Sequence, residues 1–387
     1  MLKNLRGLQK RLFALRPLTP TARTSTQRYR PAIDTLEDRC CPSLTVLAPG
    51  YSVTTFAPPP NLGVQATGPD SIAVDQSGEH VFVGYNNGTV KDGSDPKARS
   101  TIVEFSDSGT VLHYWQTPGH NDGLKIDPET GNVWALQNED GKPNLTVINP
   151  HTTAMTAYTF APPDNGGTGT PGGYDDIAFL HGKVYLTESN PDPSSTTGSA
   201  VVQVKLPSDP AVNNRVIIVR TVLPLVTTAT DPTGKTVSLT LTDPDSMTAK
   251  GNNLVFTSQA DDLVLTIHNP GQHQTVTVVN VHDATNASLE VDDTIFTPNS
   301  HGAILVVDSA GTVYEITGSA VKKGLVLSSG DASDALGTFD PKTGLFTPVI
   351  TGFAGQPKGL AFLPTEGSDD GFDGGSDDGQ GHYHQGG

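Results

Sequence analysis

"NDGLKIDPETGNVWAL" spans residues 121–136 and joins two short apolar runs through a polar turn. Asp122 stands at the start of the first run, and the second run follows "DPETGN". Pro, Gly, Asn and Asp are typical of tight turns, so the stretch predicts a β-hairpin whose first strand begins at Asp122. Whether Asn121 and Asp122 form a binding site, or only the turn before a strand, depends on what the rest of the chain repeats.

The first apolar run recurs along the chain, in most copies directly behind an Asp. The copies are "DSIAVD" (70–75), "DGLKID" (122–127), "DDIAFL" (175–180), "DSMTAK" (245–250), "DDTIFT" (292–297) and "KGLAFL" (358–363). Two or three further short runs follow most of them, which makes about four strands per unit. Four-stranded units at intervals of 52, 53, 70, 47 and 66 residues predict an all-β fold, a single β-propeller with antiparallel blades. Six blades fit best, and five or seven are alternatives.

The remaining runs fill in the blades. The second run of the fifth unit is expected at 303–308, directly after its first run. The last unit has little chain behind it, so residues 44–57, two apolar runs around Pro49-Gly50, are expected to close the ring from the N-terminal side. The long intervals are assigned to Pro/Thr-rich loops at 190–200 and 224–240 and to an extra hairpin within 329–345. A two-domain sandwich does not explain why the same first residue recurs.

The ends of the chain differ from this body in charge. Residues 1–42 are basic, whereas the whole chain has a net charge of −17; we interpret them as a basic leader. Residues 366–387, Gly-rich and acidic, read as a disordered tail, which leaves 43–365 for the propeller. An acidic body disfavours nucleic acid as a partner, and no apolar run is long enough to predict a membrane span. The adjacent Cys40 and Cys41 do not imply a disulfide framework.

The repeat places like residues at one position of successive blades, which is a circle around the central channel. They are Asp70, Asp122, Asp175, Asp245 and Asp292, with Lys358 at the sixth place. Carboxylates facing one another repel, and a hard cation such as Ca²⁺, the Lys358 ammonium or backbone amides can offset that repulsion. The alternative is that each Asp only caps the turn before its strand. Asp75 and Asp127 are interpreted as such turn residues.

These motifs resemble the six-bladed NHL-type and gluconolactonase/regucalcin-like propellers. In the gluconolactonase-like group a divalent cation sits on a Glu, an Asn and an Asp, positions that fall on Asp70, Asp175 and Asp245 here. The resemblance also implies that an Asn-Asp-Gly step, here Asn121, Asp122 and Gly123, binds substrate. Asp replaces both Glu and Asn at the first two ligand positions, and the Arg expected upstream of Asn-Asp is absent.

Two shorter resemblances concern the ends of the fold. Residues 343–364 are similar to bacterial secreted propellers of the scytonemin-cluster type. "RPAIDTLEDRCCPS" (30–43) resembles a leader of bacterial cell-surface and secreted proteins. Together they imply an exported, extracellular or cell-surface protein.

From these observations we expect a monomeric exported propeller that binds a small molecule or a surface partner at an acidic channel mouth. The expected metal ligands are Asp70, Asp175 and Asp245, with Asp292 nearby and Ca²⁺ or another divalent cation as the metal. Asn121, Asp122 and Lys358 are the candidate substrate-binding residues. A Ca²⁺-dependent lactonase or ester hydrolase, with Asp122 and His120 as catalytic residues, and a purely structural surface module are the alternatives.

Overall fold

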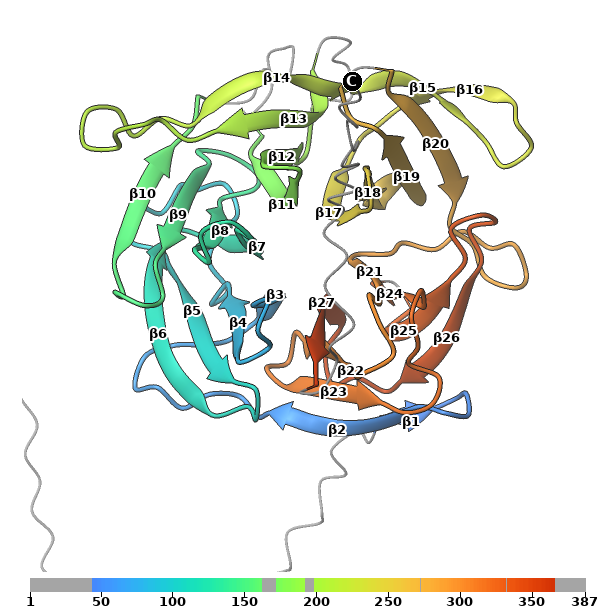
Figure 1. The fold of residues 1–387 in the computed structure, drawn as a ribbon, viewed down its shortest axis with the longest axis horizontal. Coiled ribbons are helices and arrows are strands. Elements are labelled where there is room, and N and C mark those ends of the chain that lie inside the picture. Colours follow the sequence, from blue (N-terminus) through green and yellow to red (C-terminus); the bar gives the residue numbers. More distant parts are fainter. Residues whose placement is uncertain (1–43, 162–171, 192–197, 272, 332, 366–387) are drawn as a thin grey trace, which may run out of the picture. The chain divides into compact units, whose positions relative to one another are not determined.

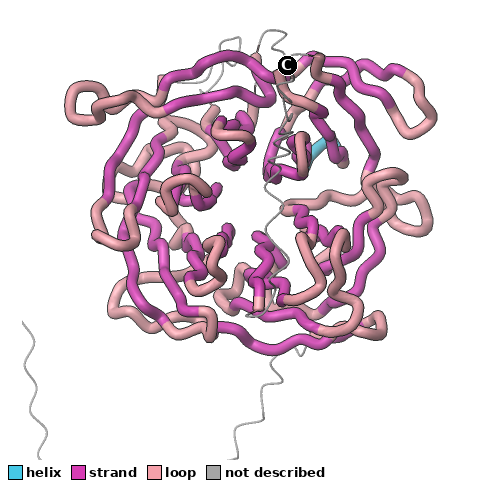
Figure 2. The backbone as a smooth tube through the Cα atoms, in the orientation of Figure 1, coloured by secondary structure: helices cyan, strands magenta, loops and turns pink. Residues whose placement is uncertain are grey.

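The fold was analysed in a computed structural model, which describes residues 44–161, 172–191, 198–271, 273–331 and 333–365. This part of the chain is almost entirely β-structure, and its one helix is a 3₁₀ turn at Gln259–Asp261 (Figure 2). Six antiparallel sheets surround a central channel as the blades of a β-propeller (Figure 1). The predicted fold class and blade number are therefore confirmed. The predicted leader and tail lie outside the described residues.

The first three blades follow the chain without interruption. Blade 1 consists of β3 (Pro69–Val74), β4 (His80–Tyr85), β5 (Arg99–Ser106) and β6 (Val111–Pro118). Blade 2 consists of β7 (Asn121–Ile126), β8 (Val133–Gln137), β9 (Asn144–Ile148) and β10 (Met155–Thr159). Blade 3 consists of β11 (Tyr174–Leu180), β12 (Lys183–Glu188), β13 (Ser199–Lys205) and β14 (Ile217–Pro224). In each, the run that begins the repeat is the innermost strand, as predicted.

Blade 4 carries an insertion where the sequence predicted a loop. Its four strands are β17 (Pro244–Lys250), β18 (Asn253–Ser258), β19 (Leu263–His268) and β20 (Thr275–Asn280). Residues 224–240 form a Thr-rich hairpin, β15 (Val226–Thr230) and β16 (Thr236–Thr240), which extends the sheet to six strands through one parallel pair, Thr230 with Thr277. The predicted loop at 190–200 lies mostly outside the described residues.

Blades 5 and 6 exchange strands. Blade 5 contains β21 (Thr294–Phe296), β24 (Val326–Gly330), β25 (Ala335–Phe339), β26 (Phe346–Thr351) and, at its edge, β1 (Thr45–Val46). Blade 6 contains β27 (Pro357–Pro364), β22 (Gly302–Asp308), β23 (Val313–Thr317) and β2 (Ser52–Ala57). The chain thus enters blade 5, builds two strands of blade 6, returns to complete blade 5, and ends as the inner strand of blade 6.

The exchange corrects two predictions. The run at 303–308 is not the second strand of the fifth unit, because β22 pairs with β27 and β23 in blade 6. The hairpin expected within 329–345 is not extra but part of the main body of blade 5. β22 is apolar on both faces and almost fully buried, so it fits between two strands of any blade. Pattern alone therefore does not select its partner.

The N-terminal run closes the ring as expected, but it serves two blades. β2 pairs antiparallel with β23 as the outer strand of blade 6, while the two-residue β1 pairs with β26 of blade 5. The first and last strands of the described chain therefore contribute to the same sector of the ring.

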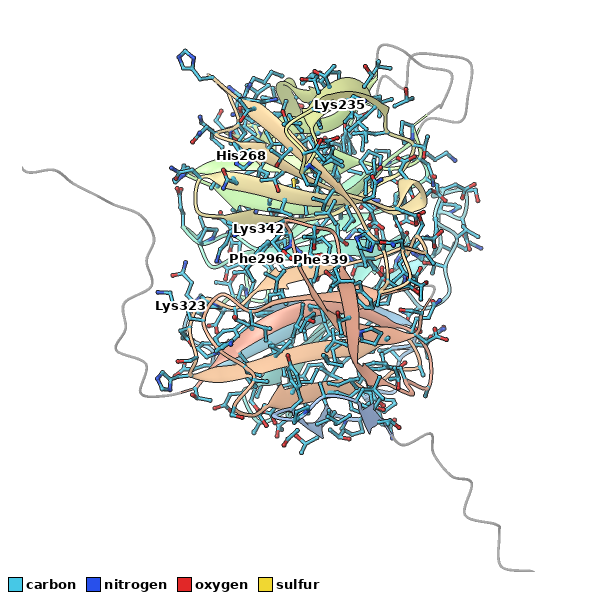
Figure 3. The ribbon with its side chains drawn as sticks, turned by 90° about the vertical axis from the view of Figure 1, so that its right-hand side faces the viewer. Lys235, His268, Phe296, Lys323, Phe339 and Lys342 are labelled. Atoms are coloured by element: carbon cyan, nitrogen blue, oxygen red, sulfur yellow. The ribbon has the colours of Figure 1, made fainter. Side chains whose placement is uncertain are left out.

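Six apolar clusters fill the six spaces between adjacent blades. Successive side chains on a strand point to opposite faces, so each blade supplies both of its neighbours. On β4, Val81 and Val83 pack toward blade 6 while Phe82 packs toward blade 2. Phe296 lies against the cluster that contains Phe339, between blades 4 and 5 (Figure 3).

Trp115 and Trp134 are each 4% exposed and belong to the core. Among the described residues, no helix is long and apolar enough to span a bilayer.

Candidate functional site

Near the start of most inner strands, two consecutive residues are not paired with the second strand of the blade. In β3, β7, β11, β17 and β27 the register with the second strand shifts at this point, so that two inner residues oppose one. Such a β-bulge re-aims the side chains of the residues it contains. The blades therefore present two stacked circles of residues to the channel, which we call the first ring and the second ring.

The first ring is the predicted circle of acids. Its members are Asp70, Asp122, Asp175, Asp245, Asp292 and Lys358. The five aspartates line one small cavity of about 20 Å³ together with residues of the second ring. A space of this size holds about one water-sized particle. The ring itself therefore admits an ion or a water, and any larger ligand has to bind outside it.

The second ring joins each blade to the next. Its members are Ser71, Gly123, Asp176, Ser246, Asp293 and Gly359. Asp176 accepts a hydrogen bond from the Met247 amide of blade 4 (2.8 Å), and Asp293 accepts one from the Leu360 amide of blade 6 (2.7 Å). These buried carboxylates hold neighbouring inner strands together.

The smaller members of the second ring act at the other four junctions. The Ser71 hydroxyl donates to the Asp122 carbonyl of blade 2, and the Ser246 hydroxyl donates to Asp292 of blade 5 (3.2 Å). A Cβ on Gly123 would lie 2.3 Å from the Asp175 carbonyl oxygen, and one on Gly359 would lie 2.6 Å from that of Asp70. Glycine is thus required where two blades approach most closely.

The first ring does not behave as a set of turn caps. Asp127, at the far end of β7, accepts hydrogen bonds from the Glu129 amide and the Thr130 hydroxyl, so it is a turn residue as predicted. Asp75 caps the equivalent turn of blade 1 through His80 and Ser77. By contrast, between the described residues no backbone amide donates to the side chains of the first-ring aspartates.

Three carboxylates converge at the mouth: Asp122, Glu139 and Asp175 each place an oxygen within 4.8 Å of the other two. This is the set, among the described residues, that comes close enough to hold a metal ion, and it differs from the predicted Asp70, Asp175 and Asp245. Glu139 lies in the β8–β9 loop, is 4% exposed, and forms an ion pair with Lys91.

Sequence reasoning missed Glu139 because only the starts of inner strands were considered. In antiparallel blades the loop between the second and third strands reaches the same end of the channel. The acids in "NEDGK" (138–142) were the available signal.

Burial and mutual repulsion set the protonation of this cluster. Burial raises the pKa of Asp122 well above its usual value, and the charges of Asp175, Glu139 and Asp70 raise it further. Burial also raises the pKa of Asp175. For Glu139 burial acts in the same direction, but the hydrogen bond with Asp122 and the Lys91 charge outweigh it and lower the pKa. A protonated Asp122 that donates to an ionised neighbour fits these directions.

Lys358 neutralises the other side of the ring. Its Nζ lies 2.9 Å from Asp292 and 3.2 Å from Asp331, an acid in the β24–β25 loop that the sequence analysis did not consider. Burial raises the pKa of Asp292 to about 6, with the opposing charge of Lys358 holding it lower than it would otherwise be. Burial raises the pKa of Asp245 as well, and Asp175 and Asp292 add to the shift.

Asn121 and His120 do not line the ring cavity. The Asn121 side chain is fully buried and donates to the Leu136 carbonyl of its own blade at 2.8 Å. His120 is 5% exposed, and its Nδ1 lies 2.8 Å from the Thr89 carbonyl oxygen. Both side chains fasten loops and strands behind the ring.

Comparison with known proteins finds solved structures of low sequence identity and assigns no family. No protein-family model and no curated protein matches the chain. One of these structures is a protein from Bacteroides uniformis with a provisional description as a 6-phosphogluconolactonase. It is 14% identical to this chain, covers 78% of this chain and 90% of its own, and has a TM-score of 0.43. Its Bacteroides fragilis counterpart is 15% identical over 78% and 88%, with a TM-score of 0.41.

A further match has a different activity. Kuenenia stuttgartiensis hydrazine synthase is 10% identical over 70% of this chain and 64% of that one, with a TM-score of 0.39. At these values the similarities bear on neither the reaction nor the ligand, and the site has to be interpreted from its own geometry.

Proposed function

We propose that the propeller binds a divalent cation, best matched by Ca²⁺, at the acidic mouth of its channel, and that the cation holds a small polar ligand or partner there. The observation that carries the proposal is the convergence of Asp122, Glu139 and Asp175 within 4.8 Å. Ca²⁺ takes oxygen ligands at about 2.3–2.6 Å, so oxygens that share one ion lie roughly 3–5 Å apart. A donor set of carboxylates without Cys or His suits a hard cation.

The electrostatics of the cluster support a cation that competes with protons. Asp122 and Asp175 have raised pKa values because each is buried beside other carboxylates. A bound cation favours the ionised form of its ligands, so binding should release protons. When bound, the ion would supply a positive charge able to polarise a carbonyl or to hold an anionic group.

The competing internal cation is Lys91. Its ammonium pairs with Glu139, yet 57% of its side chain is exposed, so it can move into solvent when a metal ion takes its place. The exposed position of Lys91 and the burial of Glu139 together allow this exchange.

Calorimetric titration of the full chain with CaCl₂ tests the proposal. We expect binding in the wild-type protein, a fall of at least tenfold in affinity for Asp122→Asn and for Glu139→Gln, and proton release that grows as the pH is lowered from 8 to 6. Asp127→Asn is the matched control, because Asp127 directly follows the same strand but caps a turn. Equal affinity in Asp122→Asn and Asp127→Asn, or no binding at all, would refute the cation site.

Hydrolysis of a lactone or ester is a second candidate function, favoured by one observation. Asp122, whose pKa is raised by burial and by the neighbouring acids, stands among the proposed cation ligands, where a carboxylate not held by the ion could accept a proton from water. Turnover of a lactone panel that requires Ca²⁺ and disappears in Asp122→Asn would support the enzyme. Calcium binding without turnover would support a binding protein and not an enzyme. Export of the chain remains a prediction from residues 30–43.

A further inference from the structure

The channel has a second cavity at the opposite end of the inner strands, with different chemistry. Its volume is about 330 Å³, and most of its lining is apolar. We call it the funnel. The wall includes apolar side chains from all six blades, among them Val74, Ile126, Phe179, Ala249, Ile295 and Phe362. All of these are partly buried except Ala249, which is exposed.

The floor of the funnel carries its charged groups. Ile72, Lys125 and Asp293 line both the funnel and the ring cavity, so they separate the two. Lys125 is paired at 3.0 Å with Asp176, which is 5% exposed. Asp293, 7% exposed, receives one backbone hydrogen bond on each oxygen. A carboxylate oxygen has two lone pairs, so each still has acceptor capacity.

These features define a ligand class. A cavity of about 300 Å³ or more with apolar walls and few polar groups is typical of a small-molecule site. The Lys125 ammonium in the floor is already paired with Asp176, which lines the ring cavity and not the funnel, so Asp293 is the floor carboxylate available to a cationic head group. We propose that the funnel binds a small amphipathic amine, with the apolar part against the ring of wall side chains and the ammonium group beside Asp293. This site is separate from the cation site and does not depend on it.

Calorimetric titration of the full chain with n-alkylammonium ions tests the proposal. We expect n-hexylammonium to bind about threefold to fourfold more tightly per added methylene than the shorter homologues. Hexanol, which lacks the charge, should bind at least fivefold more weakly, and hexanoate should not bind. The Trp134 ring lies edge-on to Phe179 at 5.3 Å, so tryptophan emission should change on binding.

Variants locate the binding. Ala249→Phe fills the funnel from an exposed position of β17 and should lower hexylammonium affinity at least tenfold, whereas Ala157→Phe, at an exposed position of β10, should not change it. Asp293→Asn should remove the preference for hexylammonium over hexanol. Asp122→Asn, which alters the acidic mouth only, should leave hexylammonium binding within twofold of wild type.

Several results would overturn the proposal. They are equal binding of hexanol and hexylammonium, equal affinity in Ala249→Phe and Ala157→Phe, a loss of hexylammonium binding in Asp122→Asn, and no binding by the wild-type protein. Sedimentation velocity supplies a further test. If the wild-type protein dimerises and Ala249→Phe prevents it, the occupant of the funnel is a second copy of the chain, and the proposal is wrong.

Discussion

The first and second rings are neighbours in sequence, yet they do opposite things to the fold. Asp176 and Asp293 in the second ring accept amides from the next blade and so stabilise the junctions. Asp122 and Asp175 in the first ring accept no such amide from the described part of the chain, and they crowd against other acids. Buried carboxylates stabilise a protein when they are hydrogen-bonded and destabilise it when they repel. Whether an Asp stabilises or destabilises the fold therefore depends on whether it is the first or the second residue of the bulge.

The largest expected effect comes from the second ring. Asp293→Ala leaves the buried amides of Leu360 and Thr294 without an acceptor, and each unsatisfied group costs about 1–3 kcal/mol. We expect a loss of about 2–5 kcal/mol in the free energy of unfolding, measured by urea denaturation. Asp127→Ala, which removes an exposed turn cap, should cost about 1 kcal/mol or less. Similar losses in the two variants would contradict the assignment of the second ring.

A smaller loss is expected at the closest junction. Gly123→Ala places a Cβ 2.3 Å from the Asp175 carbonyl, and relieving such a contact typically costs about 1–3 kcal/mol. Gly131→Ala is a poor control because Gly131 has a φ of 70°. Ser246→Ala, which loses one hydrogen bond without a clash, is the better comparison and should cost about 1 kcal/mol. Thermal or urea unfolding ranks the two.

The first ring should make stability fall as the pH rises. The pKa of Asp292 is about 6 in the folded protein, above the value near 4 of an unfolded chain. Its contribution is therefore complete below about pH 4 and is lost as the pH rises through 6. Asp122 and Asp175 shift in the same direction. Without divalent cations we expect Tm to fall by several degrees between pH 5 and 8, and CaCl₂ should remove most of that fall.

Asp122→Asn should reverse the usual sign of a buried substitution. It removes one charge from the cluster, so at pH 8 without cation we expect the variant to be about 1 kcal/mol more stable than wild type. Addition of CaCl₂ should stabilise the wild type and not the variant. Differential scanning fluorimetry at pH 5 and pH 8 would check both. Destabilisation at both pH values would mean that Asp122 holds the blades together, as the second ring does.

Lys91 is expected to affect calcium binding more than stability. More than half of its own side chain is exposed, but Lys91→Gln leaves the buried Glu139 carboxylate without its ion pair, so we expect a loss of about 1 kcal/mol in the free energy of unfolding. It should nevertheless raise calcium affinity severalfold, since the ion no longer displaces an ammonium from Glu139. Unchanged or weaker calcium binding would remove Lys91 from the site.

The sequence predicted the fold and the first ring because both follow from the spacing of the repeat and from the residue type at its first position. An Asp before an apolar run marked the inner strands, and the structure places them where the repeat required. Three features depend on contacts that no local pattern encodes. These are the pairing of β22 with β27, the convergence of Glu139 on Asp122, and the funnel, whose wall side chains look like ordinary core positions.

The strand order of blades 5 and 6 affects how the chain folds during its synthesis. Ser52–Ala57 pairs with Val313–Thr317, about 260 residues further on. At synthesis rates of about 5–20 residues per second, the first strand emerges from the ribosome on the order of ten seconds to a minute before its partner exists. During that time "SVTTFA" is an unpaired edge, the kind of segment that holdase chaperones protect and that aggregation recruits. A fragment that stops before Pro357–Pro364, the inner strand of blade 6, lacks a strand that is needed to close the ring.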